Sequence, residues 1–317
     1  MQPGKRSREL RSRERAHEMA ILINKKTKVL LQGITGKMGN LHTKYMLEYG
    51  VDLVAGISPG KGGSNVLGVP VFNTIPKALE HTPIDATMVL VPSLAVKNSA
   101  IEAIESGIKL AVIITEFVPV HDTCYLKRLA LERGVRIVGP NTIGVISPGK
   151  TKVGIMPGSI YSEGPVGVVG RSGTLIHDIG ATLTGLGIGQ STCVGIGGDP
   201  IRGSDFVDML KDFATDDETK VVVMIGEIGG VGEEQAAKYI ESGYPKPVLA
   251  FIAGQTAPAG KQMGHAGAIV SAGGGSAESK YSALAKAGVR VTKTFGELIR
   301  AVKEELQPTA KSQSVGD

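Results

Sequence analysis

His265 stands in a setting that suits chemistry. It lies in the run GKQMGHAGAIV at 260–270, among small residues that leave the imidazole little side-chain cover and let other backbone approach closely. A histidine can act as a nucleophile or transfer a proton near neutral pH. A tight loop with a merely solvated histidine would give the same run. The role of His265 therefore depends on which other residues the fold brings to it.

Single polar side chains follow several apolar runs. Glu227 and Asp199 each come just after such a run in the second half of the chain, and Thr115 with Glu116 follows one in the first half. In an open α/β sheet, ligands lie outside the carboxyl ends of the strands, so we expect these side chains to meet at one crevice. Glycines chosen only for packing would explain the neighbouring glycines, but not Asp199 and Glu227.

Two glycine-rich turns predict anion sites. GITGKMG at 33–39 follows an apolar run and opens a helical stretch, and RSGTL at 171–175 does the same in the second half. The free backbone N–H groups at a helix start can receive an anion such as phosphate. We therefore expect one anion site at the first turn and another at Ser172, Gly173 and Thr174.

The loop after the second apolar run argues against NAD. A dinucleotide-binding domain of the NAD type carries Asp or Glu at this point, where the carboxylate holds a ribose hydroxyl. This chain has SPGKGG at 58–63, and Lys61 suits an additional phosphate instead. The sequence thus disfavours an NAD-dependent dehydrogenase.

Apolar runs at the spacing of alternating strands and helices fill both halves of the chain. Alternation of this kind predicts mostly parallel sheets covered by helices, the α/β class. The pattern restarts after 144–149, and 317 residues are enough for two cores, so we expect two domains. The predicted strands lie at 28–32, 51–57, 86–91, 110–114, 135–138, 166–169, 190–196, 221–225 and 247–252.

Composition excludes several classes of protein. No run approaches 18 apolar residues, which disfavours a membrane span, and the two cysteines lie far apart, without the spacing of a zinc site or a disulfide framework. Residues 1–18 hold six basic and three acidic side chains, so +3 of the net charge of +5 lies there. No basic stripe with aromatics follows, which argues against nucleic-acid binding. We interpret 1–18 as a disordered basic extension rather than a targeting signal, and expect a cytoplasmic setting.

Seven motifs, in order, resemble a known family. They are GITGKMG at 33–39, SPGKGG at 58–63, GPNTIG at 139–144, RSGTL at 171–175, VGIGGDP at 194–200, MIGEIGG at 224–230 and MGHAGAI at 263–269. From about residue 19 to about residue 306, the chain resembles the α subunit of succinate–CoA ligase, in the NDP-forming acyl-CoA ligase family. The resemblance implies a Rossmann-like CoA-binding domain at 19–144. A flavodoxin-like, doubly wound ligase domain with a phosphohistidine loop would follow at 145–317.

The resemblance also implies site residues. His265 falls on the histidine that carries phosphate, Glu227 on the carboxylate that orients it, and Ser172, Gly173 and Thr174 on the helix start that binds the phosphoryl group. It implies no metal ligands in this chain. The implied CoA contacts are Thr35, Gly36, Lys37, Met38, Lys61, Ile114, Thr115 and Glu116.

The implied reaction is reversible. An acid, CoA and a nucleoside triphosphate give acyl-CoA, nucleoside diphosphate and phosphate, and with succinate this is a step of the tricarboxylic acid cycle. The chain has no Walker A motif and no ATP-grasp pattern. ATP or GTP and Mg²⁺ would therefore come with a separate β subunit of the ATP-grasp fold, in a hetero-oligomer.

Departures from the family pattern leave the acid open. The chain has Thr142-Ile143 where the family commonly has Cys-Pro, Gly170 where it has Ser, and His177 where a tyrosine near the organic acid is common. The imidazole of His177 either replaces a phenol as a hydrogen-bonding group for succinate, which needs fewer assumptions, or admits another acid. A sister ligase for malate, citrate or another short acid is thus an alternative. A non-catalytic CoA-binding regulator is another, although it would not need His265 and Glu227 together.

Overall fold

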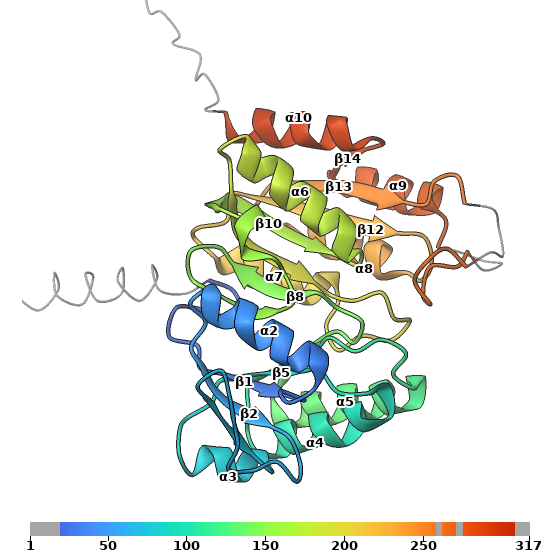
Figure 1. The fold of residues 1–317 in the computed structure, drawn as a ribbon. Helices are drawn as coiled ribbons and strands as arrows, with labels where there is room; N and C mark the ends of the chain where they lie inside the picture. Colours follow the sequence, from blue (N-terminus) through green and yellow to red (C-terminus); the bar gives the residue numbers. More distant parts are fainter. Residues whose placement is uncertain (1–19, 258–261, 271–274, 308–317) are drawn as a thin grey trace, which may run out of the picture.

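The computed structural model describes residues 20–257, 262–270 and 275–307, and it divides the chain between two seven-stranded sheets, one above the other in Figure 1. The predicted extension at 1–18 lies outside the described residues, as do residues 260 and 261 of the run around His265. Among the described helices, none is both long enough and apolar enough to cross a membrane.

The first sheet is a Rossmann-type sheet. Its strands are β1 (Val29–Gln32), β2 (Leu53–Ile57), β3 (Asn65–Val66), β4 (Val69–Phe72), β5 (Ala86–Val89), β6 (Leu110–Ile113) and β7 (Arg136–Val138). They lie in the order β3-β4-β2-β1-β5-β6-β7, and all pairs except β3 with β4 are parallel. Without β3, this is the strand order of dinucleotide-binding domains, so the predicted class of the first domain is confirmed.

Helices cover both faces of the first sheet. They are α2 (Lys37–Glu48), α3 (Ile75–Leu79), α4 (Val96–Glu105) and α5 (Val120–Arg133), and a short 3₁₀ turn, η1 (Ser93–Ala95), precedes α4. Successive residues of β6 alternate between two cores, since Leu110 and Val112 pack on the face of α2, and Ala111 and Ile113 pack under α4 and α5. This period of two explains why the strands read as continuous apolar runs.

The second sheet is flavodoxin-like, with an added hairpin. Its strands are β8 (Gly144–Ser147), β9 (Thr151–Gly154), β10 (Glu163–Gly170), β11 (Gln190–Gly195), β12 (Val221–Glu227), β13 (Val248–Ala253) and β14 (Arg290–Thr292). The order is β14-β13-β12-β10-β11-β8-β9. The five parallel strands β10 to β14 have the doubly wound order expected of the second domain.

Five helices flank this second sheet. They are α6 (Gly173–Gly185), α7 (Phe206–Thr215), α8 (Gly232–Glu241), α9 (Ala277–Lys286) and α10 (Phe295–Leu306), and the 3₁₀ turn η2 (Gly158–Ile160) precedes β10. Buried residues of α6 and α10 share one core, and those of α7, α8 and α9 share the other. In Figure 1, α10 and α6 accordingly lie above the sheet.

The hairpin β8–β9 joins the two domains and was not predicted. It pairs antiparallel with β11, and Val145 and Val153 pack in the same core as Leu31 and Met88 of the first sheet. Its short strands carry no long apolar run, which is why the sequence pattern misses them. The strands β3, β4 and β14 were also missed, for the same reason. Because the hairpin packs against both sheets, the limits 19–144 and 145–317 stay a prediction.

Candidate active site

One cavity of about 650 Å³ collects the ends of strands from both domains. The first domain contributes residues that follow β5 and β6, and the second contributes the start of α6 and the loop of His265. Its lining is Met38, Leu90, Val91, Ile114, Thr115, Glu116, Asn141, Thr142, Ile143, Ile155, Arg171, Gly173, Thr174, His177 and His265. Eight of the predicted site residues thus line one cavity.

His265 and Glu227 form a direct pair. Nδ1 of His265 donates to Oε2 of Glu227 over 2.7 Å, and Glu227 is the last residue of β12, with its side chain 7% exposed. The hydrogen bond to Glu227 raises the pKa of His265, and partial burial of the ring opposes this. With Nδ1 held by the carboxylate, Nε2 is the ring nitrogen left for chemistry.

The ring of His265 lies against a glycine. A Cβ on Gly198 would lie 2.4 Å from Cγ of His265, so any larger residue at 198 would displace the imidazole. Gly198 belongs to the loop that follows β11, which also holds Asp199. Burial raises the pKa of Asp199, and the charge of His265 works against that rise. The glycine in the GGDP motif is therefore explained by the close approach of the histidine.

Arg171 was quoted in a motif but not predicted as a site residue. Its buried guanidinium forms an ion pair with Oε1 of Glu227, at 3.0 Å from Nη2, and Nη1 donates to the carbonyl oxygen of Gly229 over 3.0 Å. The two oxygens of Glu227 are thus shared between an arginine and a histidine. Nothing in the spacing of the sequence signals this contact, because it joins residues 56 positions apart.

A buried ion pair holds the backbone of Glu227. Nζ of Lys280, on α9, donates to the carbonyl oxygens of Glu227 and Gly229, each at 2.7 Å, and pairs with the carboxylate of Glu233. The other oxygen of Glu233 accepts the backbone N–H of Glu227 over 3.1 Å. Burial lowers the pKa of Lys280, and the charge of Glu233 opposes this. Both backbone groups of Glu227 are therefore fixed by one charged pair.

The start of α6 faces the same cavity. Ser172 is the N-cap of the helix, and its hydroxyl accepts the backbone N–H of Leu175 over 3.4 Å. Gly173 and Thr174 line the cavity, whereas Ser172 does not. The first N–H groups of a helix have no partner within the helix, so this end can hold an anion.

The turn before α2 is built more openly. Gly33 has φ +86°, and a Cβ on Gly39 would lie 2.1 Å from the carbonyl oxygen of Gly33, so both glycines are needed for the tight approach of helix to turn. Gly36 is the N-cap of α2 and offers no side-chain cap. Met38 lines the cavity, while the other predicted CoA residues of this turn, Thr35, Gly36 and Lys37, do not.

The Lys61 loop lies beside the turn before α2. The hydroxyls of Thr35 and Ser58 are hydrogen-bonded at 2.6 Å, and the backbone N–H of Lys61 donates to the carbonyl oxygen of Ser58. Lys61 is exposed and is not part of the cavity lining. Of these predicted contacts, Thr35, Gly36, Lys37 and Lys61 therefore lie outside the cavity lining, and only Met38 belongs to it.

The remaining predicted CoA residues line the cavity. Thr115 donates its hydroxyl to the carbonyl oxygen of Val91 over 2.7 Å, which ties the ends of two neighbouring strands together. Ile114 is buried and Glu116 is exposed. The hydroxyl of Thr115 is already used within the protein, so the exposed carboxylate of Glu116 is the more available polar group at this strand end.

Two of the departures from the family pattern shape the cavity wall. Thr142 donates its hydroxyl to the carbonyl oxygen of Gly195 and accepts the backbone N–H of Gly144 over 2.9 Å. Ile143 lies 2.5 Å from where a Cβ on Gly173 would stand. His177 also lines the cavity, and burial lowers the pKa of its imidazole. The lowered pKa favours the uncharged, hydrogen-bonding interpretation of His177.

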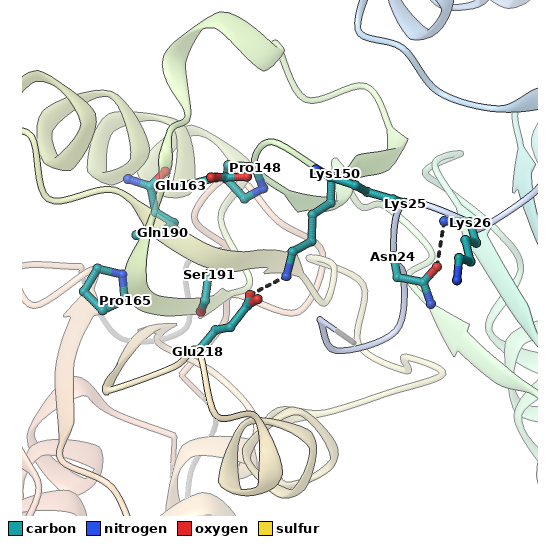
Figure 2. A pocket seen from close by; sticks show the side chains of 11 residues that line it. Asn24, Lys25, Lys26, Pro148, Lys150, Glu163, Pro165, Gln190, Ser191 and Glu218 are labelled. Atoms are coloured by element: carbon teal, nitrogen blue, oxygen red, sulfur yellow. Dashed lines mark hydrogen bonds and ion pairs between the residues drawn. The ribbon is translucent and has the colours of Figure 1, made fainter. Parts of the chain in front are cut away.

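A second cavity, of about 710 Å³, contains none of the predicted site residues. Figure 2 shows it where β10 and β11 begin, with Lys150 paired to Glu218 and the side chain of Asn24 accepting the backbone N–H of Lys26 over 2.8 Å. In the described part of the chain, no group of three or more His, Cys, Asp or Glu side chains is arranged to hold a metal ion.

Comparison with protein families and known proteins agrees with this geometry. Residues 24–117 match the family model described as CoA binding domain, and residues 169–290 match the one described as CoA-ligase. The chain is 51% identical over 288 residues to succinate–CoA ligase [ADP-forming] subunit alpha 2 of Archaeoglobus fulgidus, covering 91% of this chain and 100% of that protein. It is 51% identical over 290 residues to succinate–CoA ligase [ADP-forming] subunit alpha of Staphylococcus aureus, covering 90% of this chain and 96% of that protein.

A solved structure shares the fold. ATP citrate lyase of Methanosaeta concilii, in complex with (3S)-citryl-CoA, superposes with a TM-score of 0.84 at 25% identity, over 94% of this chain. The match covers 53% of the lyase chain, so this chain spans about half its length.

Proposed function

Because the chain belongs to the family of succinate–CoA ligase α subunits, we propose that it carries the phosphohistidine of a nucleotide-dependent acid–CoA ligase, with His265 as the phosphorylated residue. The observation that supports this most directly is that His265, hydrogen-bonded to Glu227, lines one cavity with the start of α6. Transfer of a phosphoryl group requires a nucleophile and an anion site beside it. Here the nucleophile is an imidazole whose other nitrogen is held by a carboxylate.

The chemistry proceeds in two phosphoryl transfers and one acyl transfer. The lone pair on Nε2 of His265 attacks the γ-phosphorus of the nucleoside triphosphate, and the phosphorus–oxygen bond to the diphosphate breaks. The hydrogen on Nδ1 stays on the ring and remains donated to Glu227. A carboxylate oxygen of the acid then takes the phosphoryl group from Nε2. The CoA thiolate attacks the resulting acyl phosphate at its carbonyl carbon, forming the thioester and releasing phosphate.

The protein contributes electrostatics to both phosphoryl transfers. Positive charge develops on the imidazole as Nε2 bonds to phosphorus, and the carboxylate of Glu227 stabilises it. The N–H groups at Gly173 and Thr174 meet the phosphoryl oxygens, where a helix dipole contributes about 0.3–1 kcal/mol, and more where water is excluded. Arg171 holds Glu227 from its other oxygen, so the carboxylate does not need to reorganise during the reaction.

CoA binding is assigned to the first domain. The matched CoA binding domain at 24–117 includes Thr35, Gly36, Lys37, Met38, Lys61, Ile114, Thr115 and Glu116. We propose that the exposed ammonium of Lys61 meets a phosphate of CoA on the surface beside the cavity, and that the thiol end reaches into the cavity past Ile114 and Glu116.

The nucleotide and Mg²⁺ belong to a partner in this proposal. A subunit named alpha implies another subunit, which we propose to be a β subunit of the ATP-grasp fold, in a cytoplasmic hetero-oligomer. The relatives named above are ADP-forming, so we propose ATP as the nucleotide and succinate as the acid. Because Thr142, Ile143 and His177 line the cavity, malate and citrate are the acids to compare with succinate.

The test is transfer of a labelled phosphoryl group. The complex of this chain with its partner, incubated with γ-labelled ATP or GTP, is expected to take up a label that is stable in base and lost in acid. His265→Asn is expected to remove that label, while His121→Asn, at an exposed histidine of α5, is expected to keep it. Label on the His265→Asn protein would contradict the assignment.

A further inference from the structure

His177 is hydrogen-bonded on one side to a buried tyrosine. Nδ1 of His177 lies 2.7 Å from the hydroxyl of Tyr161, and the two rings meet edge to face with centroids 6.1 Å apart. Tyr161 follows η2 and is 6% exposed, in the core beneath α6. His177 itself lines the cavity that holds His265. Its Nδ1 therefore faces the protein core, and Nε2 is the ring nitrogen available to a ligand.

A glycine on α6 makes room for the tyrosine. A Cβ on Gly180 would lie 2.3 Å from Cε1 of Tyr161, so the phenol ring occupies the space where a side chain at 180 would be. Gly180 stands three residues after His177, on the same face of the helix. Tyr161, His177 and Gly180 thus pack together, and this packing fixes the positions of the tyrosine and histidine rings.

The hydrogen bond selects one tautomer of His177. Within the residues that the structure describes, the hydroxyl of Tyr161 has no hydrogen-bond partner except Nδ1 of His177. If Nδ1 carried the hydrogen, the buried hydroxyl hydrogen of Tyr161 would have no acceptor, which costs free energy. The satisfied arrangement has the phenol donating to Nδ1, and the neutral imidazole then carries its hydrogen on Nε2.

We propose that Tyr161 is a positioning residue that fixes His177 as an uncharged Nε2–H donor to the carboxylate of the acid substrate. The identity of the ligand in this inference rests on the proposed function. The tautomer of His177 rests only on its hydrogen bond with Tyr161. A single neutral N–H can donate to any carboxylate that reaches it. An uncharged ring also makes binding of the acid independent of pH between pH 6.5 and 8.5.

The surrounding groups support an uncharged ring. Burial lowers the pKa of His177, and Asp178 on the same helix opposes this. Burial raises the pKa of Tyr161, and Cys193 of β11 raises it further, so the phenol keeps its hydrogen. Across the cavity stand Glu116, Arg171 and His265.

The first measurement reads the tautomer directly. The full chain, labelled with ¹⁵N in its histidines, is compared with His177→Tyr to identify the signal of His177. We expect Nε2 to carry the hydrogen from pH 6.5 to 8.5, and titration with succinate, malate and citrate to shift this signal. A hydrogen on Nδ1, or a ring that becomes protonated in this range, would overturn the proposal.

The second measurement separates binding of the acid from the other steps, in the complex with the partner subunit. Tyr161→Phe is expected to raise KM for the acid about three- to tenfold, with KM for CoA and the rate of His265 phosphorylation unchanged. Gly180→Ala, which pushes the ring of Tyr161, is expected to change KM in the same direction.

Two variants serve as matched controls. Tyr244→Phe removes another buried hydroxyl, one without a hydrogen-bond partner. Gly185→Ala adds a methyl group at the end of α6, where it would meet nothing within 4 Å beyond its chain neighbours and the backbone of its own helix. Both are expected to keep the wild-type KM. An unchanged KM in Tyr161→Phe would overturn the proposal. Absence of acid-dependent CoA ligation in the wild-type complex would instead contradict the proposed function, and the tautomer measurement would still decide the role of Tyr161.

Discussion

The turn before α2 and the turn before α6 both bring a glycine-rich stretch from the end of a parallel strand to the start of a helix. Around the α2 turn there is no side-chain cap at Gly36, and its neighbour Lys61 is exposed. Around the α6 turn, Ser172 caps the helix, and Arg171, Glu227 and His265 form a connected set of charged or titratable groups.

The difference corresponds to two uses of an anion site. A phosphate of CoA that is bound and released intact needs donors and a positive charge, and exposed groups can supply both. A phosphoryl group that moves between atoms also needs a nucleophile and a fixed counter-charge, which must be buried to be held in place. The predictions that follow test whether the buried groups act in transfer and the exposed ones only in binding.

The largest effect is expected at Glu227. Glu227→Gln keeps the shape of the side chain but removes the charge that stabilises the phosphorylated imidazole, so single-turnover phosphorylation of His265 is expected to slow by about 10²- to 10³-fold. Glu116→Gln, at a carboxylate that lines the cavity of His265, is the control and is expected to keep the rate. Equal rates in the two variants would remove the distinction between the two turns.

Loss of the buried lysine is expected to lower stability. Lys280→Met leaves the carboxylate of Glu233 buried without its partner, which is expected to cost about 3–5 kcal/mol in the free energy of unfolding. Urea unfolding of this variant is compared with Lys286→Met, an exposed lysine of the same helix, which is expected to cost little. A similar small cost for both would mean that the Glu233 carboxylate finds another partner.

A weaker effect is expected at the first turn. Lys61→Ala is expected to weaken binding of CoA by about tenfold, the scale of one hydrogen bond to a charged group, and to leave dephospho-CoA and His265 phosphorylation unchanged. Calorimetry with the two ligands measures this, and Lys77→Ala, an exposed lysine of α3, is the control. Equal loss for CoA and dephospho-CoA would place the lysine elsewhere on the ligand.

The helix cap at the second turn is expected to contribute modestly. Ser172→Ala removes the acceptor for the backbone N–H of Leu175, and is expected to lower the free energy of unfolding by about 1 kcal/mol. Thr294→Ala removes the equivalent cap of α10, far from the cavity, and should cost a similar amount. Only Ser172→Ala is expected also to slow phosphorylation, and the same rate in both variants would assign Ser172 to the helix alone.

The smallest effect concerns the titration of His265. Glu227 raises the pKa of His265 above the ordinary 6.5, so the midpoint of its NMR titration is expected above that value in the wild type and lower in Glu227→Gln. A raised pKa means that the pair stabilises the fold fully below pH 6.5 and loses this contribution as pH rises through the midpoint. An unchanged midpoint in the variant would show that Glu227 does not hold the ring in solution.

The strand ends could be predicted from the sequence, and the buried partners could not. Apolar runs, glycine turns and the polar residues after them give both sheets and bring His265, Glu227 and the α6 turn to one edge. Lys280 lies far along the chain on a helix, and lysines are almost always exposed, so a pattern of residue types cannot indicate that this one is buried beneath Glu227.

The contacts of His177 show the same limit. Its departure from the family pattern was visible in the sequence, but Tyr161 reaches it from the connection before β10, and only the packing on Gly180 brings the two rings together. The hairpin β8–β9 was missed because its strands, GVIS and TKVG, hold no apolar run longer than two residues.

The hairpin also determines how the two domains unfold. Val145 and Val153 complete a core that includes Leu31 and Met88 of one sheet and Val169 and Val194 of the other. Unfolding either domain alone would expose that shared apolar surface to water. The free energy of unfolding one domain therefore includes the loss of its contacts with the other domain. Heating is therefore expected to give one calorimetric transition for both domains. The amide hydrogens of β8 are expected to exchange with solvent as slowly as those of the central strands.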